Sequence, residues 1–266
     1  MVVTADDFGA SIAVNEAVEQ AHRDGILTAA SLMVTGDAAA DAVARARALP
    51  DLGVGLHVVL VDGKPALPPE QVPALVGPDG RFRTDMIGMA FAIFFLPAAR
   101  RQLEAEIEAQ FAAFAATGLP LDHVNAHKHF HLHPTIANAI LRIGRSYGMR
   151  AVRAPVEPGN RGIESWWAKR LRMRLRIAGL TVPDQVIGLS WSGAFDTERM
   201  RSALAELGPG LTEFYSHPAT ADSYPGSAPG YRYRDELAAL VDPVAKAMLV
   251  DGAIGHGNFM RFATPA

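Results

Sequence analysis

The sequence predicts an α/β fold, a TIM-like (β/α) barrel with about seven strands, formed as a single domain over residues 1–266. Short runs rich in Val, Ile and Thr alternate with segments of helical periodicity, a pattern typical of repeated βα units. The chain has 266 residues, of which 49% are hydrophobic, and one barrel commonly takes ~250 residues. Polar side chains also recur at the carboxyl ends of predicted strands, where barrel enzymes gather their catalytic groups.

The first βα unit is the clearest. A strand over Val2–Ala5 leads into the loop Asp6-Asp7-Phe8-Gly9, and a helix is expected over Ile12–Arg23. Helical spacing places four small apolar residues on one face, which we expect to pack on the sheet: Val14, Ala17, Val18 and Ala21.

The later elements follow the same alternation. Further strands are expected at Ala29–Val34, Gly53–Val58, Leu121–Ala126, Ala151–Ala154, Gln185–Leu189 and Leu211–Ser216. Helices are expected at Ala38–Leu49, at Pro97–Thr117, from Pro134 onward and at Trp166–Ile177. The Pro- and Gly-rich stretch Pro65–Arg81 predicts a long loop that contributes to a substrate site.

Composition narrows the class of protein. The formal charge of −3 offers no net positive field for phosphate backbones, so no nucleic-acid partner is expected. The absence of cysteine leaves His, Asp and Glu as metal ligands. Because no secretory signal precedes Val2 and the longest apolar stretch, Met86–Leu96, is far below the ~20 residues of a membrane span, we expect a cytoplasmic protein.

Three polar sites predict a metal centre at the barrel mouth. Asp6 and Asp7 follow the first strand, His57 lies near the end of the third, and His127 follows Val124–Ala126. Two imidazoles and one carboxylate are a common ligand set of catalytic zinc sites, and they leave coordination positions open for water and substrate. One aspartate, Asp7, would bind the ion while Asp6 takes a proton from water. Taken singly, the aspartates could instead cap a helix, and His57 could be a core histidine.

A histidine run extends this site. His123, Asn125 and His127 share one face of the predicted strand. We assign only His127 to the metal, and expect His129 and His131 to contact substrate or to orient ligands. His123 and His133 are expected to be structural.

Another strand end, Glu213–Pro218, places His217 at the mouth. An imidazole titrates near neutral pH, so His217 is our candidate general acid, with a turn histidine as the alternative. Glu213 is a candidate for substrate or ligand support. Arg153, near the end of the short strand Ala151–Ala154, is expected to orient Asp6 or the substrate.

Four separated motifs resemble the YdjC/ChbG family of carbohydrate deacetylases: Thr4–Gly9, Gly55-Leu56-His57 with Gly63-Lys64-Pro65, the cluster around His127, and Ser216-His217-Pro218. The resemblance implies Asp7, His57 and His127 as metal ligands and Asp6 as the base, in agreement with the strand positions.

Two tracts, Asp24–Met33 and His123–Pro134, are similar to the hopanoid-biosynthesis branch of that family, HpnK. This similarity implies removal of the acetyl group from an N-acetylglucosaminyl bacteriohopanetetrol, a membrane glycolipid. One departure is Asn125, where chitooligosaccharide-specific members carry Asp. This difference weakens the inference that the chain acts on the soluble substrates of those members.

Two segments suit an amphiphilic substrate independently of the resemblance. Met86–Leu96 supplies Met and aromatic side chains. Trp166–Ile177 combines two tryptophans with five cations, which is typical of a helix at a membrane surface. Its expected apolar stripe is Trp167, Leu171, Leu175 and Ala178. The alternatives are a buried helix and an ordinary surface helix.

We therefore expect a metal-dependent amide hydrolase acting on an N-acetylglucosamine-bearing lipid, peripheral at the inner membrane surface. Zn²⁺ is favoured by the two imidazoles, with Mg²⁺ as the alternative. Two other hypotheses stay open: a deacetylase of soluble chitooligosaccharides, and a non-catalytic sugar or lipid carrier with a structural metal.

Overall fold

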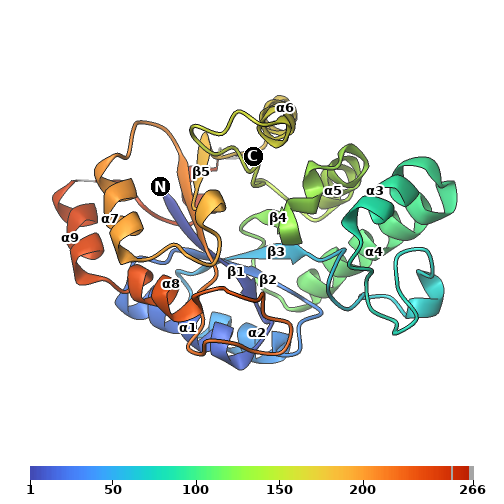
Figure 1. Cartoon of the computed structure of the whole chain (residues 1–266), viewed down its shortest axis with the longest axis horizontal. Coiled ribbons are helices and arrows are strands. Elements are labelled where there is room, and N and C mark those ends of the chain that lie inside the picture. The colour runs from blue at the N-terminus through green and yellow to red at the C-terminus, as the bar shows by residue number, and fades with distance from the viewer. Residues whose placement is uncertain (253, 264–266) are drawn as a thin grey trace.

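A computed structural model describes residues 1–252 and 254–263 and has a six-stranded parallel sheet at its centre (Figure 1). The strand order is β4-β3-β2-β1-β6-β5, so the first strand lies in the middle. The strands are β1 (Val2–Phe8), β2 (Ala29–Leu32), β3 (Gly53–Val58), β4 (Val124–Ala126), β5 (Gln185–Ile187) and β6 (Thr212–Ser216). The predicted α/β class with a parallel sheet is confirmed.

The expectation of about seven strands is not confirmed. The segment Ala151–Ala154 is extended, but it is joined to β4 only by an isolated bridge and by hydrogen bonds with both backbone groups of Val124. Farther along, the carbonyl of Val156 accepts a hydrogen bond from Val186 of β5. The segment therefore lies between β4 and β5 without a ladder, since Pro155 has no N–H with which to continue one.

Helices surround the sheet, as Figure 1 shows. They are α1 (Ile12–Asp24), α2 (Ala39–Arg47), α3 (Met86–Phe95), α4 (Pro97–Ala116), α5 (Pro134–Ser146), α6 (Ile163–Ile177), α7 (Thr197–Ala205), α8 (Tyr233–Leu240), α9 (Pro243–Asp251) and α10 (Phe259–Phe262). Short 3₁₀ helices occupy η1 (Pro69–Gln71), η2 (His127–Leu132) and η3 (Leu189–Trp191). The predicted core face of α1 is confirmed, because Val14, Ala17, Val18 and Ala21 are all buried.

The loop after β3 is held by two buried polar residues of α4. The carboxylate of Glu106 accepts hydrogen bonds from the backbone N–H groups of Ala66 and Leu67, and Gln110 bonds both backbone groups of Val59. These bonds compensate buried polar groups that would otherwise be costly. They fix the start of the Pro-rich loop against α4.

The two amphiphilic segments form helices that are only partly covered. On α3, Met89 and Ile93 are buried while several larger apolar side chains are exposed, so this segment is not a fully buried helix. On α6, Leu171 and Leu175 face the core, whereas Trp167 of the expected stripe is 37% exposed. No helix in residues 1–252 and 254–263 is long and apolar enough to cross a membrane.

Candidate metal and active site

An irregularity in β1 brings both aspartates into one cavity. Ala5 pairs with Ala30 of β2, and the next matched pair is Phe8 with Leu32, so β1 contains one extra residue between them. Asp7 adopts a φ of 62° at this point. A bulge re-aims side chains that regular alternation would send to opposite faces. Helix capping does not explain the pair, because the N-cap of α1 is Ser11.

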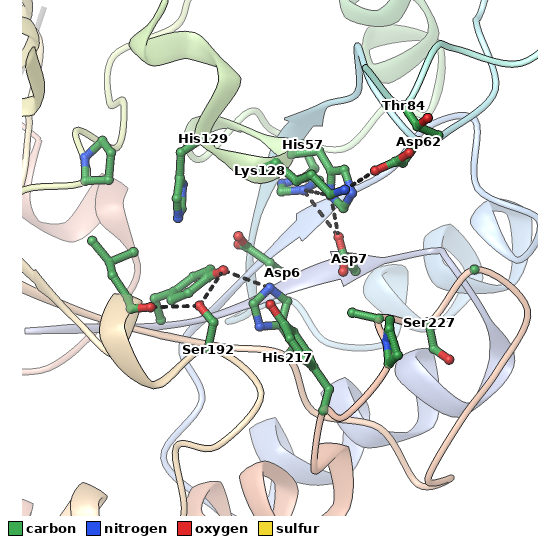
Figure 2. A pocket seen from close by; sticks show the side chains of 18 of the residues that line it. Asp6, Asp7, His57, Asp62, Thr84, Lys128, His129, Ser192, His217 and Ser227 are labelled. Carbon is green, nitrogen blue, oxygen red and sulfur yellow. Dashed lines mark hydrogen bonds and ion pairs between the residues drawn. The ribbon is translucent and has the colours of Figure 1, made fainter. Parts of the chain in front are cut away.

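Asp7, His57 and His127 converge on one point, as predicted (Figure 2). The Oδ1 of Asp7 lies 3.3 Å from Nε2 of His57 and 3.2 Å from Nδ1 of His127. The two imidazole nitrogens are 3.2 Å apart. These three atoms therefore form a nearly equilateral triangle.

The residues fit a divalent metal ion. The Oδ1 atom of Asp7 is buried and accepts no hydrogen bond, although buried carboxylate oxygens normally have partners. Ligands bound tetrahedrally at about 2.0–2.1 Å are about 3.3 Å apart, close to the observed triangle.

Hydrogen bonds around His57 determine which of its two ring nitrogens carries the proton. Ser31 Oγ lies 2.8 Å from Oδ1 of Asp6 and 3.1 Å from Nδ1 of His57, and Asn125 Oδ1 lies 2.7 Å from the same Nδ1. An ionised carboxylate only accepts, so Ser31 donates to Asp6 and offers His57 an acceptor. Nδ1 therefore carries the proton, and Nε2 keeps its lone pair toward Asp7 and His127.

Asp6 is the most heavily bonded group of the site. Its Oδ1 accepts hydrogen bonds from Ser31, from Asn125 (2.9 Å) and from Arg153 (2.9 Å), while Oδ2 accepts one from Arg153 at 2.6 Å. The guanidinium of Arg153 also donates twice to Oε1 of Glu213. Arg153 and Glu213 are both fully buried, so one cation lies between two buried carboxylates.

This arrangement keeps Asp6 ionised. Burial raises the pKa of the Asp6 carboxyl, but the adjacent charge and hydrogen bonds of Arg153 outweigh it and hold that pKa well below its usual range. Arg153 does not line the cavity. Arg153 therefore bonds Asp6 from outside the cavity lining, and Glu213 is joined to Asp6 through Arg153.

His217 lies at the cavity wall after β6, close to Asp6 in Figure 2. Its Nε2 is 2.9 Å from the hydroxyl of Tyr215, which also accepts a 3.3 Å hydrogen bond from Ser192. Burial raises the pKa of Tyr215 well above its usual value, so this hydroxyl keeps its proton; it can donate to a neutral His217 ring or accept from a protonated one. The ring of His217 is thereby held in place at the cavity wall.

The other histidines of the run have separate positions. His129 lines the cavity, and burial followed by the charge of Arg153 lowers its pKa, so the ring is neutral. His131 is buried outside the cavity lining, where Nε2 donates to the carbonyl of Arg153 at 2.9 Å. His123 bonds Asp122 and stacks on a phenylalanine of α10, and His133 is the N-cap residue of α5.

The cavity has a volume of about 770 Å³ and a rim with unusual backbone conformations. Among the described residues, four other than glycine have positive φ, and all four line the cavity: Asp7, Asp62, Lys128 and His129. Such conformations persist where surrounding structure imposes them, often at functional sites. An ion pair joins Lys128 to Asp62 across this rim (Figure 2). The predicted loop also contributes, through Asp79 and Arg81.

A family model described as YdjC-like protein matches residues 1–251. The chain belongs to the YdjC-like family. A carbohydrate deacetylase from Geobacillus stearothermophilus is 31% identical over 98% of this YdjC-like chain and 97% of its own. Another, from Thermoanaerobacter pseudethanolicus, is 28% identical over 89% and 88%. With the carbohydrate deacetylase of Brevibacillus brevis the identity is 40%, but the match spans only 55% of this chain and 56% of the relative.

Solved structures agree with the YdjC-like fold. The crystal structure of a candidate cellobiose-phosphate cleavage protein from Enterococcus faecalis superimposes with a TM-score of 0.80, at 25% identity, over 99% of this chain and 98% of that one. A lactam utilization protein from Thermus thermophilus gives a TM-score of 0.51 at 17% identity, over 97% of this chain and 100% of that one, which indicates the fold alone.

Sequence reasoning assigned no role to two residues of this site. Ser31 lies in the middle of β2, and its position on the same strand face as Ala29, pointing into the barrel, was the available signal. Tyr215 lies between Glu213 and His217 on β6 and was treated only as part of that strand. Neither contact could be inferred without knowing which strands pair.

Proposed function

We propose that this protein is a metal-dependent N-deacetylase that hydrolyses the acetamide of an amino sugar. The observation that carries the proposal is a triangle of metal-binding atoms beside a separately held, ionised Asp6 in one cavity. Relatives that match nearly the whole chain are carbohydrate deacetylases.

Each residue has a chemical task in this proposal. A divalent ion held by Asp7, His57 and His127 would supply a Lewis acid that activates water and stabilises an oxyanion. Asp6 takes the proton of the attacking water through Oδ2, since Oδ2 accepts one hydrogen bond where Oδ1 accepts three. His217 donates a proton to the departing nitrogen, with Tyr215 holding its ring.

The ion we favour is zinc. Two imidazoles suit Zn²⁺ better than Mg²⁺, which prefers oxygen ligands. Metal analysis of protein purified without chelators tests this assignment. Magnesium alone, with full activity, would contradict it.

For the substrate we propose an N-acetylglucosaminyl hopanoid. The support is the similarity of the Asp24–Met33 and His123–Pro134 tracts to the hopanoid-biosynthesis branch, together with exposed apolar helices next to the cavity. Acetate release from an N-acetylglucosaminyl bacteriohopanetetrol should be compared with release from diacetylchitobiose. A higher kcat/KM for diacetylchitobiose would refute the lipid assignment and favour a soluble chitooligosaccharide.

The substitution Asp6→Asn separates catalysis from the carrier hypothesis. We expect acetate release to fall by a factor of about 10²–10⁴, because an amide cannot take the proton, while metal content stays unchanged. The exposed Asp51→Asn is the matched control and should retain full turnover. Undiminished hydrolysis by Asp6→Asn would refute the assignment of the base, and no hydrolysis by wild-type protein loaded with metal would favour the carrier.

A further inference from the structure

Two helices expose large apolar side chains near the cavity mouth. On α3 these include Ile87 (74% exposed) and Phe95 (65%), and on α6 they include Trp166 (54%). We call the whole set the apolar belt: Ile87, Phe91, Phe94, Phe95, Leu96, Trp166 and Trp167. Monomeric proteins rarely expose a continuous apolar surface of this kind without a partner.

The two parts of the belt are linked through the segment from Leu132 to Pro134. The ring of Phe94 packs edge-on against His133, with centroids 6.2 Å apart. Pro134, the next residue, lines a groove of about 470 Å³ together with Leu132 and both tryptophans of α6. Leu132 also lines the catalytic cavity. The groove and the cavity therefore adjoin at Leu132.

The charge of α6 is opposite in sign to that of the whole chain. No acidic residue occurs between Glu164 and Asp184, and five cations do, although the chain carries a formal charge of −3. Arg172 and Arg176 turn back to bond Asp184. The remaining three cations are exposed, and Arg170 lies over the Trp166 ring at 5.4 Å: Lys169, Arg170 and Arg174.

We propose that the apolar belt and the three exposed cations dock the protein on an anionic lipid surface. Tryptophan and phenylalanine partition to the headgroup region, and lysine or arginine near such a surface contributes about fivefold each to binding. A second copy of the chain suits the face less well, since a two-fold interface would oppose identical basic helices. Docking by this face would bring the cavity mouth close to the headgroups, whatever sugar the cavity accepts.

The charge contribution can be tested by co-sedimentation of the full chain with vesicles. Vesicles of phosphatidylcholine mixed with phosphatidylglycerol should retain wild-type protein, and added salt should release much of it. The triple variant Lys169→Glu, Arg170→Glu and Arg174→Glu should bind at least about a hundredfold more weakly. Its matched control reverses three exposed cations elsewhere and should bind normally: Arg23→Glu, Arg47→Glu and Lys246→Glu.

A second variant tests the apolar contribution without changing charge. Phe91→Ser with Phe95→Ser should abolish the binding that survives in high salt, while release of acetate from a soluble acetylated amino sugar stays at the wild-type rate. Absence of wild-type binding to anionic vesicles would overturn the inference. So would a concentration-dependent dimer that this variant disrupts. Because the soluble assay is separate, either failure is distinguishable from failure of the proposed deacetylase activity.

Discussion

Replacing Arg153 with methionine should destabilise the protein by about 3–5 kcal/mol near neutral pH. The substitution removes the one cation between two buried carboxylates, Asp6 and Glu213, which are 2% and 0% exposed. Breaking a buried ion pair from one side has a cost of that size because it leaves an uncompensated charge. Methionine has a similar length and adds no polar group, so the loss reflects the charge rather than a large cavity.

The effect should depend on pH in a definite direction. In the wild-type protein the folded-state pKa of Asp6 lies below its ordinary value of 3.8, so the pair contributes stability that is present above that value and lost as pH falls below it. Without Arg153, burial of Asp6 loses its main opposing effect, so the pKa of Asp6 should rise. The variant therefore loses stability as pH rises through this raised pKa, and the difference between the two proteins widens from about pH 4 to about pH 7.

Urea unfolding followed by circular dichroism at about pH 5 and about pH 7 measures both effects. Arg142→Met is the matched control, since Arg142 forms only a surface ion pair with Glu104 and should cost less than about 1 kcal/mol. Adding Glu213→Gln to the Arg153 variant should recover part of the loss by removing one unpaired charge. A loss below about 1 kcal/mol at neutral pH, or one that does not change with pH, would refute this account.

Three other substitutions probe the same site. Ser31→Ala should weaken metal binding by about 10–100-fold, measured by competition with a chromogenic chelator, since His57 loses an orienting partner. Unchanged affinity would show that Asn125 alone orients the His57 ring. Asn125→Asp should move the acidic limb of the rate profile to higher pH, because it places a second carboxylate beside Asp6. An unmoved limb would show that the new carboxylate is compensated. His217→Gln should lower kcat about 10²–10⁴-fold with little change in KM, and a selective rise in KM would instead indicate a binding role.

Strand ends were the predictable part of this site. The carboxyl ends of parallel strands meet at one edge, so Asp7, His57 and His127 could be placed together from the sequence pattern alone. The bulge that lets Asp6 and Asp7 enter the same cavity could not be predicted. A bulge depends on how two strands register, and register is a property of the paired sheet rather than of either strand.

The roles of Arg153 and Glu213 show a second limit. Arg153 was expected to orient Asp6 or the substrate, and it does bond Asp6. Glu213 was expected to support substrate or ligands, but it is buried and bonds Arg153 instead. Local sequence indicates the end of a strand, but not whether a charged side chain there points to solvent or finds a partner across the barrel. Their pairing spans 60 residues, so no local pattern encodes it.

The buried ion pairs of Arg153 also link Asp6 to the segment that lies between β4 and β5. The segment carrying Arg153 is tied to its neighbours by isolated bridges rather than a ladder, so backbone bonds alone hold it weakly. Its guanidinium reaches Asp6 on β1 and Glu213 on β6, two adjacent strands on the other side of the interior. Because the same contacts hold Asp6, the proposed base, and join this segment to the centre of the sheet, weakening them should disorder the Asp6 carboxylate.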